Sequence, residues 1–310
     1  MKNFALIGAA GYIAPRHMKA IKETGNNLKV AYDTNDSVGV IDSHFPEAEY
    51  FTEFERYQYY LNLLKHEGTP IDYVAICSPN YLHEPHMGLS LAQGAEVICE
   101  KPLVTDVEAL DRLKVFERNS GCKVNTILQL RYHENILALK EKVESEQRAS
   151  KYDVDLTYVT SRGKWYHASW KSEDAKSGGI CTNIGVHFYD MLSFIFGDIQ
   201  QNVVHLFEHD KAAGYLEFEK ARVRWYLSLD IDDVPEELRA KGQRTFRYID
   251  VSGSALEFSG GFTDLHTESY KQILNGNGYG LDEARTGIQI VSDIRNLPIS
   301  NAGEKHSLVR

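Results

Sequence analysis

Two basic side chains, Lys101 and His187, belong to residue types that accept protons in enzyme reactions. Lys101 lies in the triplet Glu100-Lys101-Pro102, directly after the apolar run at residues 97–99. Because proline has no N–H to donate to a sheet, we expect the strand to end there, with the charged side chains at its carboxyl end. Open α/β sheets bind their ligands at that end, whereas a solvated strand end is the alternative interpretation.

His187 lies in a glycine-rich segment, residues 178–190, and follows Asn183 by four positions. Residues four apart share one face of a helix, so we expect the two side chains to face the same way. A histidine in such a helix is by default a hydrogen-bonded core residue. The flanking glycines argue against that default, because they permit other groups to approach closely. Asn183 and His187 are therefore candidate substrate-binding residues, and His187 is a candidate catalytic residue together with Lys101.

The N-terminal segment predicts a nucleotide-binding turn between a strand and a helix. The apolar run at residues 4–7 breaks at Gly8, and Pro15 suits the first turn of a following helix. Free N–H groups at the start of such a helix bind a pyrophosphate. The match to the G-x-G-x-x-G pattern is incomplete, because Ala10 and Ile13 occupy the second and third glycine positions. The expected cofactor contacts in this turn are Gly8, Ala10, Gly11, Tyr12 and Ile13.

A carboxylate follows the second predicted strand. The run at residues 28–32 ends at Asp33, with Asp36 three positions further on. An acid at this point of a Rossmann unit hydrogen-bonds the ribose 2′-hydroxyl of NAD and would repel the 2′-phosphate of NADP. NAD is therefore the expected cofactor, with both aspartates as candidate contacts. Aspartates also suit turns, so a purely structural role is the alternative for either residue.

Polar side chains follow three further predicted strands, which end near residues 77, 99 and 129. We expect these side chains to contact the cofactor at the carboxyl edge of the sheet. They are Ser78, Asn80, His83, Glu100, Lys101 and Gln129. His83 and His86 lie three apart, a spacing that metal ligands use, but no third ligand lies nearby in the sequence, so no metal site is predicted.

Strands and helices alternate through residue 130, which predicts an α/β chain whose residues 1–130 form a Rossmann domain with a doubly wound parallel sheet. Beyond residue 131 the pattern changes to longer segments with period-2 alternation and few helices. The predicted strands are 152–160, 213–218, 222–230, 247–251 and 255–258, and the predicted helices are 186–196, 265–274 and 281–297. We therefore expect residues 131–310 to form an α+β domain with an open mixed or antiparallel sheet, which binds substrate and mediates oligomerisation.

Aromatic and basic side chains gather between the first of these strands and the next helix. Such side chains suit stacking on a ring and pairing with phosphates, whereas a hydrophobic plug between the domains would explain the aromatic residues equally well. Trp170 is a candidate cofactor contact, and the substrate candidates from this segment are Arg162, Trp165 and Tyr166. Arg131, just after the strand predicted before residue 130, is a further candidate for balancing the charge of an anionic substrate.

The composition excludes several classes of partner. The 310 residues carry a net charge of −10, which disfavours nucleic acid and acidic membrane surfaces. No apolar run reaches the ~18 residues of a membrane span. The four cysteines show no C-x-x-C spacing, which favours free thiols in a reducing compartment. A cytoplasmic protein is therefore expected.

The Glu-Lys-Pro triplet, the incomplete glycine turn and the pattern G-G-x(5)-G-x-H-x-x-D at residues 178–190 together resemble the glucose–fructose oxidoreductase and inositol dehydrogenase family. The resemblance implies that Lys101 and His187 flank a hydroxyl group whose carbon loses its hydride to NAD. Members of that family usually carry aspartate where this chain has Asn183. The difference removes a carboxylate from the proton relay.

Within that family, residues 9–17, 78–83 and 182–190 look most like the UDP-N-acetylglucosaminuronate 3-dehydrogenases of bacterial surface-polysaccharide (O-antigen) synthesis. The resemblance implies oxidation of the C3 hydroxyl of a UDP-sugar to a ketone, a homotetramer and, in some members, recycling of NADH by 2-oxoglutarate. Another sugar or inositol dehydrogenase, or an NAD-dependent glycosidase that oxidises C3 transiently, would fit the same motifs. A non-catalytic NAD or sugar sensor is expected to lack Lys101 or His187, and this chain has both.

Overall fold

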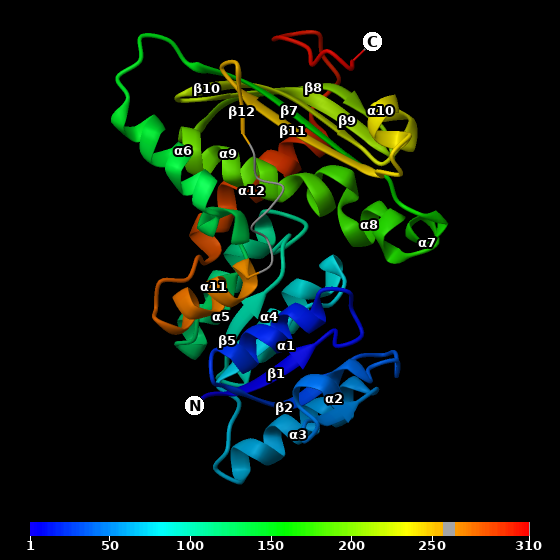
Figure 1. Cartoon of the computed structure of the whole chain (residues 1–310). Helices are drawn as coiled ribbons and strands as arrows, with labels where there is room; N and C mark the ends of the chain where they lie inside the picture. Colours follow the sequence, from blue (N-terminus) through cyan, green and yellow to red (C-terminus); the bar gives the residue numbers. More distant parts are fainter. Residues whose placement is uncertain (257–263, 310) are drawn as a thin grey trace. The chain divides into compact units, whose positions relative to one another are not determined.

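The computed structural model describes residues 1–256 and 264–309, and the chain divides into two compact units. The first unit comprises Met1–Gln129 and Thr263–Arg285, and the second comprises Leu130–Phe262 and Thr286–Arg310. The sequence pattern assigned everything after residue 130 to one domain, whereas the segment 263–285 is grouped with the N-terminal residues. Within the described ranges each unit contains one six-stranded sheet (Figure 1).

The first unit is built on a parallel sheet. Its strands lie in the order β3 (Glu49–Phe51), β2 (Asn27–Tyr32), β1 (Asn3–Ile7), β4 (Tyr73–Ile76), β5 (Glu96–Cys99) and β6 (Val124–Thr126). Every neighbouring pair is parallel, as the alternation of strands and helices predicts. The strand order reverses between β1 and β4, which makes this a doubly wound Rossmann sheet. The predicted fold of this part of the chain is therefore confirmed.

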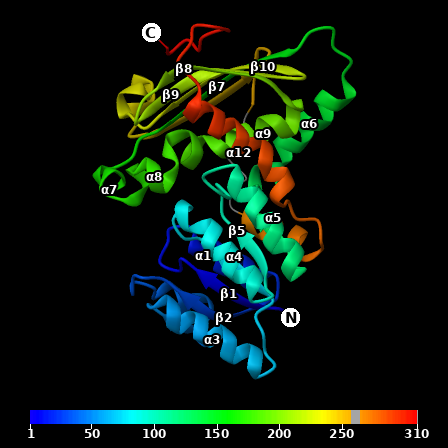
Figure 2. The same cartoon turned by 180° about the vertical axis from the view of Figure 1, so that it is seen from behind.

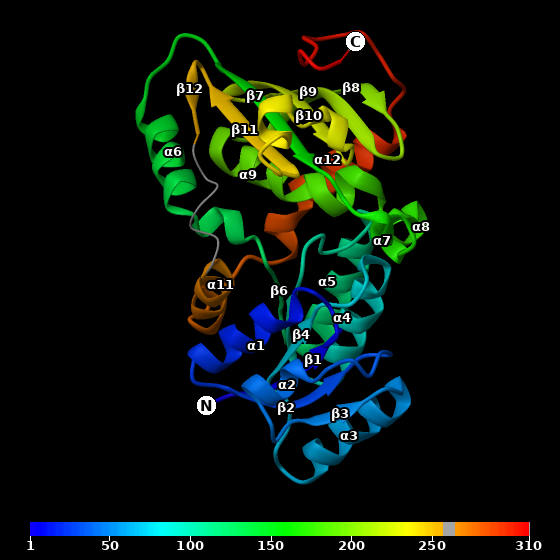
Figure 3. The same cartoon turned by 45° about the vertical axis from the view of Figure 1, so that its right-hand side comes forward.

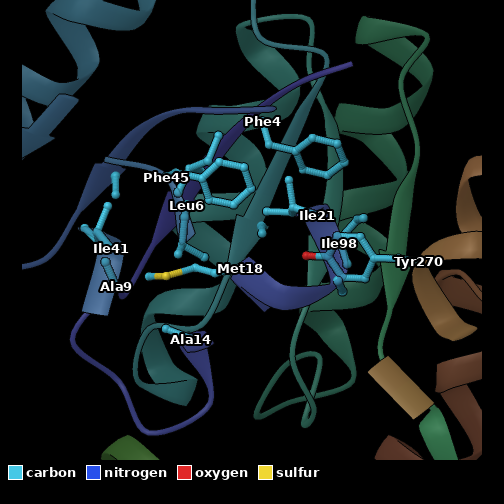
Figure 4. Packing of buried hydrophobic residues seen from close by; sticks show 14 of the residues in the cluster. Phe4, Leu6, Ala9, Ala14, Met18, Ile21, Ile41, Phe45, Ile98 and Tyr270 are labelled. Carbon is cyan, nitrogen blue, oxygen red and sulfur yellow. The ribbon is translucent and has the colours of Figure 1, made fainter. Parts of the chain in front are cut away.

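Helices cover both faces of this sheet. They are α1 (Ala14–Glu23), α2 (Val40–His44), α3 (Phe54–His66), α4 (His83–Ala92), α5 (Glu108–Ser120) and α11 (Leu265–Leu274), with the short turn η1 (Asn80–Leu82). α1 and α11 pack together on one face, and α4 and α5 pack together on the opposite face (Figures 1 and 2). Figure 4 shows the core beneath α1, where Phe4, Met18, Ile21, Ile98 and Tyr270 are buried.

The sequence of α1 explains its position in the first unit. Pro15 lies in its first turn, where the missing N–H has no helical partner to lose. Gly25 follows the end of the helix with a φ of +73°, a conformation that favours glycine. Ala14, Met18 and Ile21 recur at the spacing of one helix face and are buried. His17 lies on the same buried side and is its polar exception.

The second unit contains a mixed sheet. Its strands lie in the order β12 (Ser254–Ala255), β11 (Thr245–Val251), β7 (Tyr152–Thr160), β10 (Ala221–Ser228), β9 (Lys211–Phe218) and β8 (Ile199–Phe207). β7 and β10 are parallel and the other neighbours are antiparallel, so the prediction of a mixed sheet is confirmed. β8 was not predicted, because Gln200, Gln201 and Asn202 interrupt its alternation. The strand predicted at 255–258 lies partly outside the described residues.

The helices of the second unit are few and mostly short. They are α6 (Glu134–Ser145), α7 (Lys164–His167), α8 (Asp174–Ser177), α9 (Val186–Phe196), α10 (Glu236–Arg239) and α12 (Leu281–Asn296), in which the boundary between the units falls. The connections include η2 (Gln129–Tyr132), η3 (Trp170–Ser172), the π-helical turn η4 (Cys181–Gly185) and η5 (Ile231–Asp233). In the described part of the chain, no helix is both long enough and apolar enough to cross a bilayer.

The chain itself covers both faces of the second sheet around β10. Neighbouring residues of a strand point to opposite faces. Trp225 contacts Tyr189 of α9 on one face, with ring centroids 5.3 Å apart, whereas the ring of Tyr226 stacks on His306 of the C-terminal tail at 5.6 Å. Nε2 of His306 also lies 2.9 Å from Oγ1 of Thr157. α9 and the tail therefore lie on opposite sides of this sheet, as Figures 1 and 3 show.

Candidate active site

The carboxyl ends of the parallel strands place the predicted cofactor residues along one edge of the first sheet. β1 is followed by Gly8, β2 by Asp33, and the exits of β4 and β5 carry Ser78 and Glu100. Gln129 lies three residues after the end of the short strand β6. Because the strand order reverses between β1 and β4, a ligand crevice is expected next to these two strands.

The turn after β1 requires glycine for two reasons. Gly8 has a φ of +88°, and a Cβ there would lie 2.6 Å from both the carbonyl carbon of Cys77 and the amide nitrogen of Ser78. A larger residue would therefore push β1 away from the exit of β4. The turn leads into α1, whose first turn has no side-chain cap among the described residues. An uncapped helix N-terminus suits an anionic pyrophosphate.

Asp33 holds this turn in place. Its Oδ2 accepts a hydrogen bond from the N–H of Ala10 at 2.9 Å, and its Oδ1 accepts one from the N–H of Asn35 at 3.0 Å. The N–H groups of Gly8 and Ala9 also donate to the carbonyl oxygen at the end of β2. An ionised carboxylate has about four acceptor sites, so Asp33 keeps capacity for a ribose hydroxyl.

The other predicted contacts around this turn differ in exposure. Tyr12 is 88% exposed, and Asp36 is exposed in the loop after β2. Gly11 donates its N–H to the carbonyl oxygen of Gly8 at 3.0 Å, and the half-buried Ile13 is the N-cap residue of α1. Gly11, Tyr12 and Ile13 are positioned by the turn after β1, and Asp36 is positioned by the loop after β2.

Histidines support the exits of β4 and β5. Nδ1 of His86 lies 2.9 Å from Oγ of Ser78, and burial lowers the pKa of His86 to about 4. His83 is buried, with Nε2 2.9 Å from the carbonyl oxygen of Ser78 and Nδ1 2.7 Å from that of Pro102. Burial also lowers the pKa of His83. These contacts support a structural role for His83, which links two strand exits, with the buried Asn80 between Ser78 and His83 in the chain.

Glu100 is the centre of a buried cluster that the sequence pattern did not predict. Its Oε1 lies 3.0 Å from Nε2 of His17 and 2.8 Å from Nε2 of His266. Nδ1 of His17 lies 2.8 Å from the hydroxyl of Tyr270. Oε2 of Glu100 accepts a hydrogen bond from the N–H of Lys101 at 3.1 Å. No local pattern signals this cluster, because its members come from α1, the exit of β5 and α11.

In the second unit, Asn183 and His187 lie where the π-helical turn η4 meets α9. Both side chains are half-buried, whereas the residues on either side of each are buried. This pattern fits a shared face. Nδ2 of Asn183 donates a hydrogen bond to the hydroxyl of Tyr166 at 3.3 Å, and burial raises the pKa of that hydroxyl. Single π turns inside helices frequently lie at functional sites.

Asp190, the last residue of the glycine-rich pattern, binds Arg131. Nε of Arg131 donates to Oδ2 of Asp190 at 3.0 Å, and Nη2 donates to Oδ1 at 2.7 Å. Both residues are buried, and the guanidinium carbon lies 5.0 Å from the centre of the Phe194 ring. The charge of Arg131 is therefore balanced inside the second unit. This contact supports a structural role for Arg131, and its role in substrate binding stays a prediction.

The segment after β7 combines exposed and buried side chains. Arg162 is exposed and Trp165 is 56% exposed, so both are accessible to a ligand within this unit. Nζ of Lys171 lies 3.8 Å from the centre of the Trp170 ring, a cation–π contact. Tyr166 is only 2% exposed and belongs to the packed interior.

The two predicted catalytic residues belong to different units, Lys101 to the first and His187 to the second. Each is positioned by well-packed neighbours: Lys101 follows the buried Glu100, and His187 lies between the buried Val186 and Phe188. Their convergence on one substrate hydroxyl stays a prediction.

The sequence matches the models of two protein domains. Residues 2–127 match the NAD-binding Rossmann fold of an oxidoreductase family, and residues 140–236 match the C-terminal alpha/beta domain of an oxidoreductase family. The two matched segments fall in the first and second units respectively.

Two crystal structures are similar to this chain over nearly its whole length. Both are of the WlbA (WbpB) dehydrogenase from Thermus thermophilus, one in complex with NAD and alpha-ketoglutarate and the other in complex with NAD and UDP-GlcNAcA. Their sequences are 51% and 50% identical to this one, 99% of each chain is covered, and the TM-score is 0.95 for both.

A more distant relative is the glucose-6-phosphate 3-dehydrogenase of Bacillus subtilis. It is 24% identical over 207 residues, which cover 63% of this chain and 54% of that enzyme. The chain spans about half the length, or less, of the curated relatives it matches.

Proposed function

Because this chain belongs to the GFO/IDH/MocA family of oxidoreductases, we propose that it oxidises the C3 hydroxyl of UDP-N-acetylglucosaminuronic acid (UDP-GlcNAcA) to a ketone with NAD⁺. The observation that carries the proposal is the similarity, over both whole chains, to a dehydrogenase crystallised with NAD and UDP-GlcNAcA. The alcohol and NAD⁺ give the 3-keto sugar, NADH and one proton. The proposal includes a role for this product in bacterial surface-polysaccharide (O-antigen) synthesis.

The exits of the first sheet fit NAD. The uncapped start of α1 suits the pyrophosphate, and the carboxylate of Asp33 suits the ribose hydroxyls of the adenosine. The same carboxylate would repel the 2′-phosphate of NADP, so the chain is assigned to NAD. Bound NAD⁺ supplies the hydride acceptor of the reaction.

Lys101 and His187 are the residues that we assign to the proton. One accepts the hydroxyl proton as the hydride leaves C3, and the other orients the oxygen. Asn183 cannot act as the base, because an amide does not take up a proton near neutral pH. Asn183 hydrogen-bonds Tyr166 and precedes His187 by one helical turn, so we assign it to orientation of the sugar.

The charge of the substrate points to the basic and aromatic segment of the second unit. UDP-GlcNAcA carries a diphosphate and a sugar carboxylate, and guanidinium groups pair with both. Arg162 and Trp165 are exposed within their unit, so Arg162 is assigned to an anionic group and Trp165 to stacking on a ring.

The proposal extends to 2-oxoglutarate, which one of the two Thermus thermophilus structures contains as alpha-ketoglutarate. Transfer of the hydride to its keto group, with one proton, gives 2-hydroxyglutarate and regenerates NAD⁺. Sugar oxidation and keto-acid reduction then balance without free NADH. The family resemblance also supports a homotetramer, which light scattering would show as four times the mass of one chain.

A direct test combines the purified protein, NAD⁺ and a panel of candidate substrates. UDP-GlcNAcA is compared with UDP-N-acetylglucosamine, which lacks the carboxylate, and with myo-inositol. Absorbance at the NADH band is recorded with and without 2-oxoglutarate, and products are measured by mass spectrometry. We expect UDP-GlcNAcA to be the one candidate substrate of the panel that is consumed. When 2-oxoglutarate is present, equal amounts of 3-keto sugar and 2-hydroxyglutarate should form.

Other results would reassign the reaction. Turnover of myo-inositol without turnover of UDP-GlcNAcA would identify a different dehydrogenase of the family. Loss of UDP from the sugar without net formation of NADH or 2-hydroxyglutarate would instead indicate a glycosidase that oxidises C3 transiently.

A further inference from the structure

The carboxylate next to Lys101 is buried among imidazoles of its own unit. His17, Glu100 and His266 are 0%, 6% and 3% exposed. They come from α1, from the exit of β5 and from α11, so three separate elements meet at one carboxylate. Nε2 of each imidazole lies within 3.0 Å of the same oxygen, Oε1 of Glu100.

The protonation states follow from which atoms can donate. An ionised carboxylate only accepts hydrogen bonds, so Nε2 of both imidazoles carries a proton. The other nitrogen of His17 then accepts a hydrogen bond from the hydroxyl of Tyr270. Burial lowers the pKa of His17, which keeps its ring neutral. Although burial alone would raise it, the two imidazole contacts hold the pKa of Glu100 well below its usual value.

Hydrogen bonds account for this cluster better than a metal ion does. Two ligands of a tetrahedral zinc ion lie roughly 3.3 Å apart, given zinc–ligand distances near 2.0–2.1 Å. The two contacts of Oε1 of Glu100 are shorter, at 3.0 and 2.8 Å, and match N–H···O hydrogen bonds to an ionised acceptor. The cluster is therefore a set of donors around one buried anion.

The second oxygen of this anion is bonded to the main chain of Lys101. Oε2 of Glu100 accepts the N–H of Lys101 at 3.1 Å. After Lys101, the carbonyl oxygen of Pro102 lies 2.7 Å from Nδ1 of the buried His83. Main-chain polar groups on both sides of the Lys101 side chain thus lie within hydrogen-bonding distance of buried side chains.

We propose that His17 and His266, acting through Glu100, are positioning residues for Lys101. Without a donor, the buried carboxylate would bind a proton or turn toward water, because an unpaired buried charge is costly. Either change would weaken its hold on the N–H of Lys101. The inference rests on the proposed function, because the position of Lys101 affects turnover only if Lys101 takes part in the reaction.

Two substitutions of His266 keep or remove the N–H that donates to Glu100, and both change the size of the side chain little. Glutamine places its amide nitrogen near the position of histidine Nε2, so His266→Gln keeps an N–H, whereas His266→Leu removes it. We expect His266→Leu to lower kcat on the order of 10²-fold, the cost of a misplacement of about 1 Å, with both KM values unchanged. His266→Gln is expected to restore most of the wild-type kcat.

Amide hydrogen exchange supplies a readout that needs neither activity nor bound NAD. Mass spectrometry of peptides spanning residues 97–104 reports on the N–H of Lys101. In His266→Leu we expect this amide to exchange about tenfold faster than in the wild type, because the net contribution of one hydrogen bond corresponds to roughly that factor. In His266→Gln its exchange should stay close to that of the wild type.

His205→Leu is the matched control. His205 is also buried, and its Nε2 donates to the carbonyl oxygen of Ala302 at 2.7 Å in the second unit. This variant loses a buried histidine and one hydrogen bond, as His266→Leu does. We expect its melting temperature to fall while kcat and exchange at Lys101 stay unchanged.

The inference is wrong if His266→Leu melts as a folded protein and keeps both wild-type kcat and wild-type exchange at Lys101. If that variant does not fold, His17→Leu and His17→Gln provide the same comparison, because His17 donates to the same oxygen. Failure of the proposed function gives a different result: the wild type turns over no sugar, yet exchange at Lys101 still responds to His266→Leu.

Discussion

Glu100 and Asp190 are both buried carboxylates close in the chain to a predicted catalytic residue, but they have different partners. Asp190 accepts two hydrogen bonds from Arg131, so the pair is neutral overall. Glu100 accepts from two imidazoles, and the lowered pKa of His17 keeps that ring uncharged. His17 therefore does not balance the charge of Glu100, whereas Arg131 balances the charge of Asp190.

This difference indicates a packing role for Asp190 and a functional role for Glu100. A buried ion pair can often be replaced by apolar side chains at little cost in folding stability. A structural role is therefore enough to explain the pair of Arg131 and Asp190. A buried unbalanced charge is costly, and it stabilises a cation nearby. The residue that follows Glu100 in the chain is Lys101, and its main-chain N–H is bonded to that carboxylate. Four predictions test this comparison.

The largest expected effect comes from Lys101 itself. Lys101→Met should lower kcat by about 10²–10⁴-fold, the usual contribution of a general acid or base, while NAD⁺ affinity measured by fluorescence titration stays unchanged. Lys142→Met, on the exposed surface of α6, is the control and should keep wild-type kinetics. If Lys101→Met turned over normally, the charge of Glu100 would have no catalytic partner and the comparison would fail.

Breaking the pair in the second unit should affect stability more than chemistry. Arg131→Met leaves Asp190 buried and unpaired, which is expected to cost about 3–5 kcal/mol of unfolding free energy in urea titrations. The double variant Arg131→Met/Asp190→Leu should recover most of that loss. If the double variant is stable but its KM for the sugar rises, Arg131 also binds substrate, as its position in the sequence indicates.

We expect acid to destabilise the first unit through protonation of His86. Its pKa falls from 6.5 to about 4 on folding because of burial, so the unfolded chain binds the proton at higher pH. The resulting stability is present above pH 6.5 and is lost as the pH falls toward 4, by about 3 kcal/mol.

His86→Asn keeps an acceptor for Ser78 but does not titrate. The difference in unfolding free energy between wild type and variant should therefore shrink by that amount between pH 7 and pH 4. A constant difference would contradict this.

The smallest effect is expected at Tyr270. Tyr270→Phe removes the hydroxyl that faces Nδ1 of His17 but leaves the donor to Glu100 in place, so about 1 kcal/mol of stability should be lost with no change in kcat. Tyr57→Phe is the control, because the buried hydroxyl of Tyr57 has no hydrogen-bond partner among the described residues. Equal melting temperatures for both variants would show that Tyr270 does not support His17.

Local patterns predicted much of the fold. Alternating strands and helices predicted the parallel sheet, and period-2 alternation predicted most strands of the mixed sheet. The helices predicted at 186–196 and 265–274 coincide with α9 and α11. β8 was missed because side-chain alternation fails over its first residues, and pairing with β9 supplies what its own pattern lacks. The candidate cofactor residues of the first unit were selected because they follow predicted strands, which are recognisable from composition, and their contacts with the cofactor stay a prediction.

The sequence by itself determined the features that depend on neighbouring residues: the turn that only glycine fits at Gly8, the carboxylate after β2, and the strand that ends just before Glu100. Tertiary structure alone decided which side chains surround Glu100. His17 and His266 are 83 and 166 residues away from it in the chain, and no periodicity relates them. They meet because α1 and α11 pack on the same face of the sheet, and the packing of two helices depends on the whole core rather than on either segment.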